Sequence, residues 1–252
     1  MIYLVESFYS IQGEGKYIGS PSLFFRFGGC NMRCEGFGCT ETIDGEEILG
    51  CDTIHAVDKK HFSHTWQKID STKQLIEILN SYSLPHATDI ILTGGEPLIY
   101  ADDEIFVTFL EELHSRGHKI CFETNGSLNV DFEKHKIYKE CHFALSVKLE
   151  NSGESLKKRI NSHAINNITS KAKDAFFKFS VACEDIGENL SSEIEMIISH
   201  AKENAQVYCM PMGDNKEDVE KNSHALIEYC KTKGYNFSDR LHIRIWDKKK
   251  GI

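Results

Sequence analysis

The chain carries the stretch IILTGGEP at Ile90–Pro97, in which an apolar run ends in two glycines, a glutamate and a proline. A short apolar run bounded by glycine and proline predicts a buried β-strand followed by a tight turn. Glycines at a strand end let the backbone approach a ligand closely, and the exposed N–H and C=O groups can bind a zwitterion. The stretch is therefore either an ordinary turn or a ligand-binding turn at a strand end.

Apolar runs and amphipathic stretches alternate on both sides of this turn. Strands are predicted over Ser22–Phe27, Asp89–Thr93, Lys119–Glu123, Phe143–Val147, Phe176–Val181, Gln206–Met210 and Leu241–Ile245. Helices are predicted over Thr72–Tyr82, Asp103–Arg116, Ser191–Ala201 and Asp218–Lys233, and loops over Tyr3–Ile18 and Thr53–Asp70. This alternation is typical of an α/β fold, and we predict a partial, open βα barrel of about six parallel strands.

The composition predicts one domain over residues 1–252. A chain of 252 residues with 40% hydrophobic residues can bury a full-sized core. Its formal net charge of -9 argues against direct nucleic acid binding. No apolar run approaches the roughly 18 residues of a membrane span, and the first residues lack the pattern of a signal peptide. We therefore expect a cytoplasmic protein that does not contact a membrane.

The cysteines are unevenly distributed, because four of the nine fall in one short stretch: Cys30, Cys34, Cys39 and Cys51. Asp44-Gly45 lies among them and is a strong signal for a two-residue hairpin turn. Counting outward from the turn pairs Cys39 with Gly50, so the hairpin returns Cys51 to the first thiols. Thiolates grouped in this way bind zinc or an iron–sulfur cluster. Four would make a closed zinc site, whereas three would leave one iron of a 4Fe–4S cluster open to a ligand.

Motifs at successive strand ends follow one order along the chain. Cys30 and Cys34 form a Cys-x3-Cys pair after the first strand, and the Gly-Gly-Glu-Pro turn comes later. The motifs ETNG at Glu123–Gly126 and SVK at Ser146–Lys148 follow the next two strands. In this order they resemble the motifs of the radical S-adenosylmethionine (SAM) enzymes. The resemblance implies a 4Fe–4S cluster and a SAM site formed by Gly94, Gly95, Glu96, Glu123, Asn125, Ser146, Val147 and Lys148.

Further features narrow this resemblance. The loop IQGEG at Ile11–Gly15 precedes the first strand, Arg26 lies in that strand, and Cys51-Asp52-Thr53 closes the cysteine region. Together they resemble the 7-carboxy-7-deazaguanine synthases. The resemblance implies Mg²⁺ on the Thr53 hydroxyl and more SAM contacts from Met210, Pro211, Met212 and Gly213. It implies substrate contacts from Ile11, Gln12, Gly13, Glu14, Arg26, Thr93 and His242.

The spacing of the cysteines departs from the family pattern. That pattern is Cys-x3-Cys-x2-Cys, whereas here an insertion at about residues 35–50 separates Cys34 from Cys51. The third cluster ligand is therefore either Cys39 or Cys51. Because Asp52-Thr53 follows Cys51, we predict that Cys30, Cys34 and Cys51 hold the cluster.

The activity implied by the resemblance is that of a radical SAM carbon–nitrogen lyase. Such an enzyme converts 6-carboxy-5,6,7,8-tetrahydropterin to 7-carboxy-7-deazaguanine with loss of ammonia, in queuosine and deazapurine biosynthesis and hence in tRNA modification. The radical arises on the cofactor, so no catalytic side chain is predicted. The resemblance also implies a small pterin substrate, a flavodoxin- or ferredoxin-type reductant and a homodimer.

Two other hypotheses share part of the pattern. A radical SAM activase that installs a glycyl radical on a protein would need the cluster and the Gly-Gly-Glu-Pro turn, but not the Gln-Gly-Glu-Gly loop, Arg26 or Thr53. A zinc-stabilised binding module would instead use all four clustered thiols. The zinc module predicts a colourless protein, and the cluster predicts a brown one that tolerates loss of Cys39.

Overall fold

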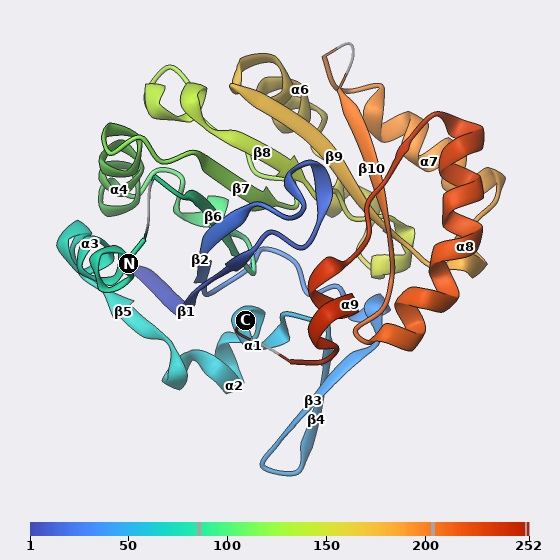
Figure 1. Cartoon of the computed structure of the whole chain (residues 1–252), viewed down its shortest axis with the longest axis horizontal. Helices are drawn as coiled ribbons and strands as arrows, with labels where there is room; N and C mark the ends of the chain where they lie inside the picture. The colour runs from blue at the N-terminus through green and yellow to red at the C-terminus, as the bar shows by residue number, and fades with distance from the viewer. Residues whose placement is uncertain (85–86, 203–204, 250, 252) are drawn as a thin grey trace.

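The computed structural model describes residues 1–84, 87–202, 205–249 and 251, and there a curved sheet is surrounded by helices (Figure 1). Its parallel strands are β2 (Pro21–Phe27), β6 (Asp89–Gly94), β7 (Ile120–Thr124), β8 (His142–Leu145), β9 (Asp174–Val181), β10 (Gln206–Pro211) and β11 (Asn236–Phe237). β1 (Ile2–Ile11) pairs antiparallel with β2, and β5 (Gln67–Ile69) with β1. The strand order is β11-β10-β9-β8-β7-β6-β2-β1-β5, which confirms the predicted open, mainly parallel barrel.

The longer helices lie around the outside of the sheet, as Figure 1 shows. They are α3 (Thr72–Ser81), α4 (Glu104–Ser115), α6 (Ser162–Lys171), α7 (Glu188–Ile198) and α8 (Lys216–Lys233). Capping residues in the local sequence determine where these helices begin and end. At the start of α4 the Asp103 side chain accepts a hydrogen bond from the Ile105 N–H, and at the end of α8 Gly234 adopts a left-handed conformation. Sequence patterns predict four of the five and miss α6.

The main core lies between the sheet and these helices. Its largest buried side chains are aromatic, and Phe25 of β2 meets Phe109 of α4 with ring centroids 5.2 Å apart. Phe122 of β7 stacks on Phe143 of β8 at 5.0 Å. Edge-to-face and offset-stacked rings add to the free energy of burial, so these pairs strengthen the contact of β2 with α4 and of β7 with β8. The strand ends that carry the polar motifs are thereby held in fixed positions.

The predicted hairpin is present as β3 (Cys39–Ile43) and β4 (Glu46–Gly50), and it projects from the body of the molecule (Figure 1). Asp44 and Gly45 both have positive φ, 51° and 80°, as a tight hairpin turn of this kind requires. Cys39 pairs with Gly50, which confirms the predicted register. The two ends of the inserted hairpin therefore lie next to each other where it joins the rest of the domain.

The stretch predicted as a loop over Tyr3–Ile18 instead contains β1. Most of this strand is half-buried, and polar residues such as Glu6 and Ser7 interrupt its apolar ones. A strand of this kind lacks the apolar alternation on which the prediction depends. The loop predicted over Thr53–Asp70 likewise holds α1 (Ile54–Val57), α2 (Lys59–Phe62) and β5, which are too short to show periodicity.

The strand predicted over Leu241–Ile245 is wrong, because these residues form α9 (Leu241–Trp246). Leu241, Ile243 and Ile245 alternate with polar residues and so imitate a strand. In the structure the sheet ends with the short β11, and the Arg244 guanidinium of α9 donates to the Ser223 hydroxyl of α8 at 2.7 Å. Packing on α8 therefore outweighs the local alternation. Among the described residues, no helix is long and apolar enough to cross a membrane.

Candidate active site

A cavity of about 420 Å³ collects most of the predicted site residues in one place. Its walls come from the loop after β1, the ends of the parallel strands, the cysteine loop and the C-terminal stretch. The predicted residues that line it are Ile11, Gln12, Gly13, Glu14, Arg26, Cys30, Cys34, Cys51, Thr53, Thr93, Gly94, Gly95, Glu123, Asn125, Ser146, Lys148, Met210 and His242. Motifs that lie as far apart in sequence as Ile11 and His242 thus face one space.

Five predicted residues lie outside the lining of this cavity: Glu96, Val147, Pro211, Met212 and Gly213. Val147 is buried in the main core, and Met212 donates its N–H to the Val181 carbonyl at 2.9 Å. Gly213 accepts a hydrogen bond from Arg240 through its carbonyl. These residues support the wall from behind.

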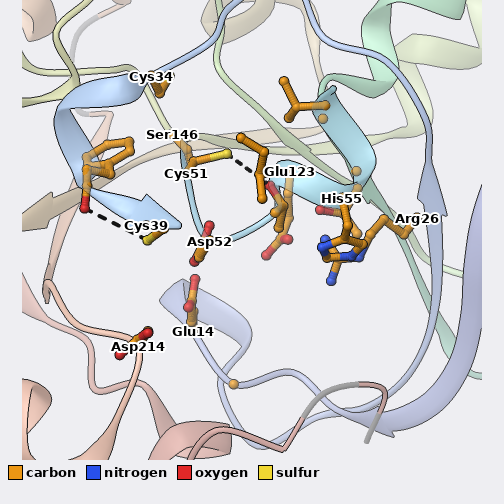
Figure 2. A pocket seen from close by; sticks show the side chains of 18 of the residues that line it. Glu14, Arg26, Cys34, Cys39, Cys51, Asp52, His55, Glu123, Ser146 and Asp214 are labelled. Atoms are coloured by element: carbon orange, nitrogen blue, oxygen red, sulfur yellow. Dashed lines mark hydrogen bonds between the residues drawn. The ribbon is translucent and has the colours of Figure 1, made fainter. Parts of the chain in front are cut away.

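The cysteine loop starts and ends at neighbouring points. The Gly29 N–H donates to the Ala56 carbonyl of α1 at 2.7 Å, which ties the start of the loop to the segment after Cys51. Cys34 adopts a left-handed backbone conformation with φ of 40°, which is uncommon for a residue with a side chain. Figure 2 shows Cys34, Cys39 and Cys51 on one side of the cavity, and Cys30 also lines it.

The thiols lie near enough to influence one another. Burial, followed by the charge of Glu96, raises the pKa of Cys30 to about 12. Burial likewise raises the pKa of Cys34 and of Cys39 to about 11. The charge of Cys51 adds to the rise at each of these three thiols. Cys51 is therefore the thiol whose charge acts on the pKa of each of the other three.

The donor set fits an iron–sulfur cluster. Thiolates are the usual ligands of such clusters, and all four thiols of the group are free. Within the described part of the chain, no three His, Cys, Asp or Glu side chains surround one position for a single metal ion. A four-iron cluster occupies more space than one ion, so its thiol ligands stand farther apart than those of a zinc ion.

The turns at the strand ends are bonded to one another and to the cysteine loop. The buried Glu96 carboxylate accepts from the Thr124 hydroxyl and the Asn125 N–H, both at 2.7 Å. Desolvation raises the pKa of Glu96 despite these donors. The Asn125 amide then donates to the side-chain oxygen of Asn31 at 2.8 Å. Glu96 thus holds the Asn125 turn beside the loop that carries Cys30.

Gly95 packs directly against the cysteine loop. A Cβ atom there would lie 2.2 Å from the Gly29 carbonyl oxygen and 2.9 Å from Cys30 Cβ. We expect Gly95→Ala to displace the Gly29–Cys30 segment, to destabilise the fold by about 1–3 kcal/mol and to lower the iron bound per chain. Thermal unfolding and iron analysis measure both effects.

Gly187→Ala is the matched control for this substitution. A Cβ at Gly187 meets no atom of the described chain within 4 Å. Because Gly187 is the N-cap residue of α7, where alanine is less favourable than glycine, the control should lower the melting temperature modestly and leave the iron content unchanged. Equal behaviour of the two variants would contradict the close packing of Gly95 on the cysteine loop.

A chain of buried charges crosses the wall of the cavity. The Lys178 ammonium donates to Glu14 Oε2 at 2.7 Å and to Glu123 Oε1 at 3.1 Å, and Arg240 Nε donates to Glu14 Oε1 at 2.8 Å. Burial alone would raise the pKa of Glu14, but the charges of Lys178 and Arg240 hold it well below its usual value. Both oxygens of Glu14 are thus engaged by cations.

A second charged group lies around Arg26. Its Nε donates to Glu6 Oε1 at 2.7 Å, and His55 Nε2 lies 3.8 Å from the same oxygen. The nearby His55 imidazole and the Arg26 guanidinium together outweigh burial and lower the pKa of Glu6 to about 2. Figure 2 shows Arg26 and His55 side by side, across the cavity from Cys39.

Sequence reasoning missed Glu6, His55, Lys178 and Arg240. A signal was present for Lys178, because a lone lysine interrupts the apolar strand pattern FFKFSV at Phe176–Val181. A charged residue inside a buried strand needs a partner and often marks a site. Arg240 carries no such signal, because it lies between the predicted elements.

The comparisons with known proteins agree with this geometry. The family model described as "4Fe-4S single cluster domain" matches residues 11–169. The 7-carboxy-7-deazaguanine synthase of Halobacterium salinarum is 28% identical over 96% of this chain and 89% of its own length. That of Rhodopirellula baltica is 27% identical over 99% and 88%. That of Bacteroides thetaiotaomicron is 36% identical over 48% and 50%.

A solved structure has the same fold. The crystal structure of QueE from Escherichia coli superimposes with a TM-score of 0.63 at 19% identity, and the match covers 96% of this chain and 94% of that one. The family model spans the cysteine loop and every strand-end motif from Gln12 to Lys148. The chain therefore belongs to the family of 4Fe-4S single cluster domains, and the relatives that match it over nearly its whole length are 7-carboxy-7-deazaguanine synthases.

Proposed function

We propose that this protein is a radical SAM carbon–nitrogen lyase that converts 6-carboxy-5,6,7,8-tetrahydropterin to 7-carboxy-7-deazaguanine with loss of ammonia. The main support for the proposal is that the residues expected to bind the cluster and SAM and those expected to bind the substrate line the same cavity. The clustered thiols and the strand-end glycines line it together with the Gln12–Glu14 loop, Arg26 and Thr53. Relatives named for this activity match along almost the whole chain.

The residues divide the cavity into two sides. Cys30, Cys34 and Cys51 hold the 4Fe–4S cluster, and SAM binds beside it against the backbone of Gly94 and Gly95. Further SAM contacts come from Glu123, Asn125, Ser146, Lys148 and Met210. When bound, the cluster and SAM supply the one-electron chemistry that side chains lack.

The pterin occupies the other side, where this chain provides the polar groups. Gln12, Arg26 and Thr93 supply donors and acceptors for the ring and its carboxylate, with Ile11, Gly13 and His242 beside them. The lining of this small space favours a pterin over the polypeptide substrate of a glycyl-radical activase.

We also propose an electron donor, an oligomeric state and a cellular location for the protein. A flavodoxin- or ferredoxin-type protein supplies the electron, and the protein acts as a homodimer in the cytoplasm. The product feeds queuosine and deazapurine biosynthesis and thereby tRNA modification. These assignments rest on the similarity to the synthases.

The test is an anaerobic assay on reconstituted protein. The protein is incubated with SAM, dithionite, Mg²⁺ and 6-carboxytetrahydropterin, and the products are identified by mass spectrometry. Formation of 7-carboxy-7-deazaguanine supports the proposal. A brown protein that cleaves SAM without forming this product would overturn the substrate, and a colourless protein loaded with zinc would overturn the cofactor.

The Mg²⁺ site is assigned to Thr53. Its hydroxyl makes no capping hydrogen bond to α1 and lies 3.4 Å from Cys51 Sγ, on the cavity wall. Mg²⁺ is a hard cation that prefers oxygen ligands. We expect Thr53→Ala to lower turnover roughly tenfold at limiting Mg²⁺ and to raise the Mg²⁺ concentration needed for half-maximal rate.

Thr53→Ser is the control, because it keeps the hydroxyl and should keep the Mg²⁺ dependence. Both variants should retain the visible absorbance of the cluster. If Thr53→Ala loses that absorbance, the residue supports the cluster rather than Mg²⁺.

A further inference from the structure

Arg240 connects three segments that meet at the cavity. Its Nε donates to Glu14 Oε1 at 2.8 Å, and its Nη2 donates to Asp52 Oδ2 at 3.1 Å. Its Nη1 donates to the Gly213 carbonyl. Glu14 belongs to the substrate-side loop, Asp52 follows the third thiol, and Gly213 follows β10. One buried guanidinium therefore joins parts of the chain that are far apart in sequence.

The planar guanidinium suits this position. It presents donors in a fixed fork and stays charged, so it can satisfy several acceptors in different directions at once. The side chain is 10% exposed, and burial of a charge at that depth is costly unless the charge is paired. Glu14 is 11% exposed and is held from its other oxygen by Lys178.

The backbone around Arg240 is fastened to the same loop. The Leu241 N–H donates to the Gly13 carbonyl at 2.9 Å, and the Gly15 N–H donates to the Ser238 hydroxyl at 2.6 Å. The loop that carries Gln12 and Glu14 is thus held on both sides of Glu14. These backbone hydrogen bonds fix the position of Arg240, so that its guanidinium can contact Asp52.

Asp52 is the contact through which Arg240 reaches the cysteine loop. It lies between Cys51 and Thr53, the proposed ligands of the cluster and of Mg²⁺. Figure 2 shows the Asp52 carboxylate pointing toward Glu14, away from Cys34. Asp52 is half exposed, so its orientation depends on its partner more than on packing.

We propose that Arg240 is a positioning residue that sets the Cys51–Thr53 segment against the Gln12–Glu14 loop. It does not touch the reacting atoms. It fixes the distance between the side of the cavity that holds the cluster and the side that holds the pterin. The inference rests on the proposed function, and it adds a residue from outside the cysteine and glycine motifs.

The test compares Arg240→Gln and Arg240→Lys with the wild type. A misplacement of about 1 Å between reactants can lower the rate about 100-fold, so we expect Arg240→Gln to lower kcat/KM for the pterin about 100-fold with unchanged iron content. Arg240→Lys keeps one charge but cannot span three acceptors, so its kcat/KM should exceed that of Arg240→Gln by roughly tenfold at most. Full activity of Arg240→Lys would overturn the proposal.

Arg244→Gln is the matched control. Arg244 lies in α9, pairs with Asp239 at 3.1 Å and also with Glu220, and does not line the cavity. The substitution should lower the melting temperature and leave kcat and KM unchanged. An equal loss of kcat/KM in Arg244→Gln would mean that loosening of α9 suffices, and it would overturn the role of Arg240.

A second variant keeps the test valid if Arg240→Gln does not fold. Asp52→Asn removes one contact of Arg240 at a half-exposed position and should lower kcat/KM in a stable protein. In the double variant, Asp52→Asn should add little to the effect of Arg240→Gln, because both act through one contact. If the losses of kcat/KM from Asp52→Asn and Arg240→Gln are fully additive in the double variant, the two residues do not act through one contact.

A spectroscopic measurement separates this inference from the proposed function. The EPR spectrum of the reduced cluster needs no pterin, and we expect it to change in Arg240→Gln because the Cys51–Thr53 segment moves. A wild-type protein that forms no carboxydeazaguanine would overturn the proposed function alone. Identical spectra of wild type and Arg240→Gln would overturn the positioning role alone.

Discussion

Cys51→Ala is expected to lose its cluster and all measurable turnover, whereas Cys39→Ala keeps both. The reason lies in the position of Cys51. Its charge raises the pKa of Cys30, Cys34 and Cys39, whereas that of Cys39 is not among the main influences on Cys30 or Cys34. Cys39 lies on β3, and its thiol donates to the Phe37 carbonyl at 3.8 Å. We therefore expect a cluster that bridges Cys30 and Cys34 to take Cys51, not Cys39, as its third ligand.

The two variants form a matched pair, because each removes one thiol at the base of the same hairpin. Iron per chain, visible absorbance and product formation are measured after anaerobic reconstitution. Cys39→Ala also tests the zinc hypothesis, since a closed site of four thiolates would need it. A protein that keeps its iron without Cys51 and loses it without Cys39 would reverse the assignment of the third ligand.

The hairpin could be predicted from the sequence because its determinants are local. Asp44 and Gly45 specify the turn, and the turn then fixes the pairing of Cys39 with Gly50. The parallel strands β2, β6, β7, β8, β9 and β10 could be predicted for a similar reason, because each is a short and largely apolar run, whereas the two-residue β11 was missed. The position of the cavity at the carboxyl ends of those strands follows from the fold.

The C-terminal stretch could not be predicted in this way. The apolar alternation of Leu241, Ile243 and Ile245 is compatible with a strand or with a short helix. The choice depends on contacts with α8 and on the sheet, which ends at β11. His242 still lines the cavity, because the N–H of its neighbour Leu241 donates to the Gly13 carbonyl.

The pairing of the buried charges could not be predicted, because the partners are distant in sequence. Lys178 meets Glu14 and Glu123, which precede it by 164 and 55 residues. Single-sequence patterns carry no information on such pairs. The sequence motifs therefore predict the turns that line the cavity, and the structure adds the cations paired with Glu14 and Glu123 beside them.

Lys178→Ala is expected to destabilise the fold severely. The side chain is 5% exposed, and its removal leaves Glu14 and Glu123 buried with one cation fewer. Loss of one partner from a buried ion pair costs about 3–5 kcal/mol, because an uncompensated charge remains. Against a total of about 5–15 kcal/mol for a typical protein, this loss is large.

Urea unfolding of the apoprotein measures the effect, with Lys231→Ala as the control. Lys231 pairs with Glu228 at 2.8 Å, but both side chains are about two-thirds exposed, so its loss should cost about 0–1 kcal/mol. Adding Glu123→Gln to Lys178→Ala should recover part of the stability, because it removes one of the charges left unpaired. If Lys178→Ala costs no more than Lys231→Ala, the two carboxylates are neutral or hydrated in the folded protein, and the charge network does not hold the walls of the cavity together.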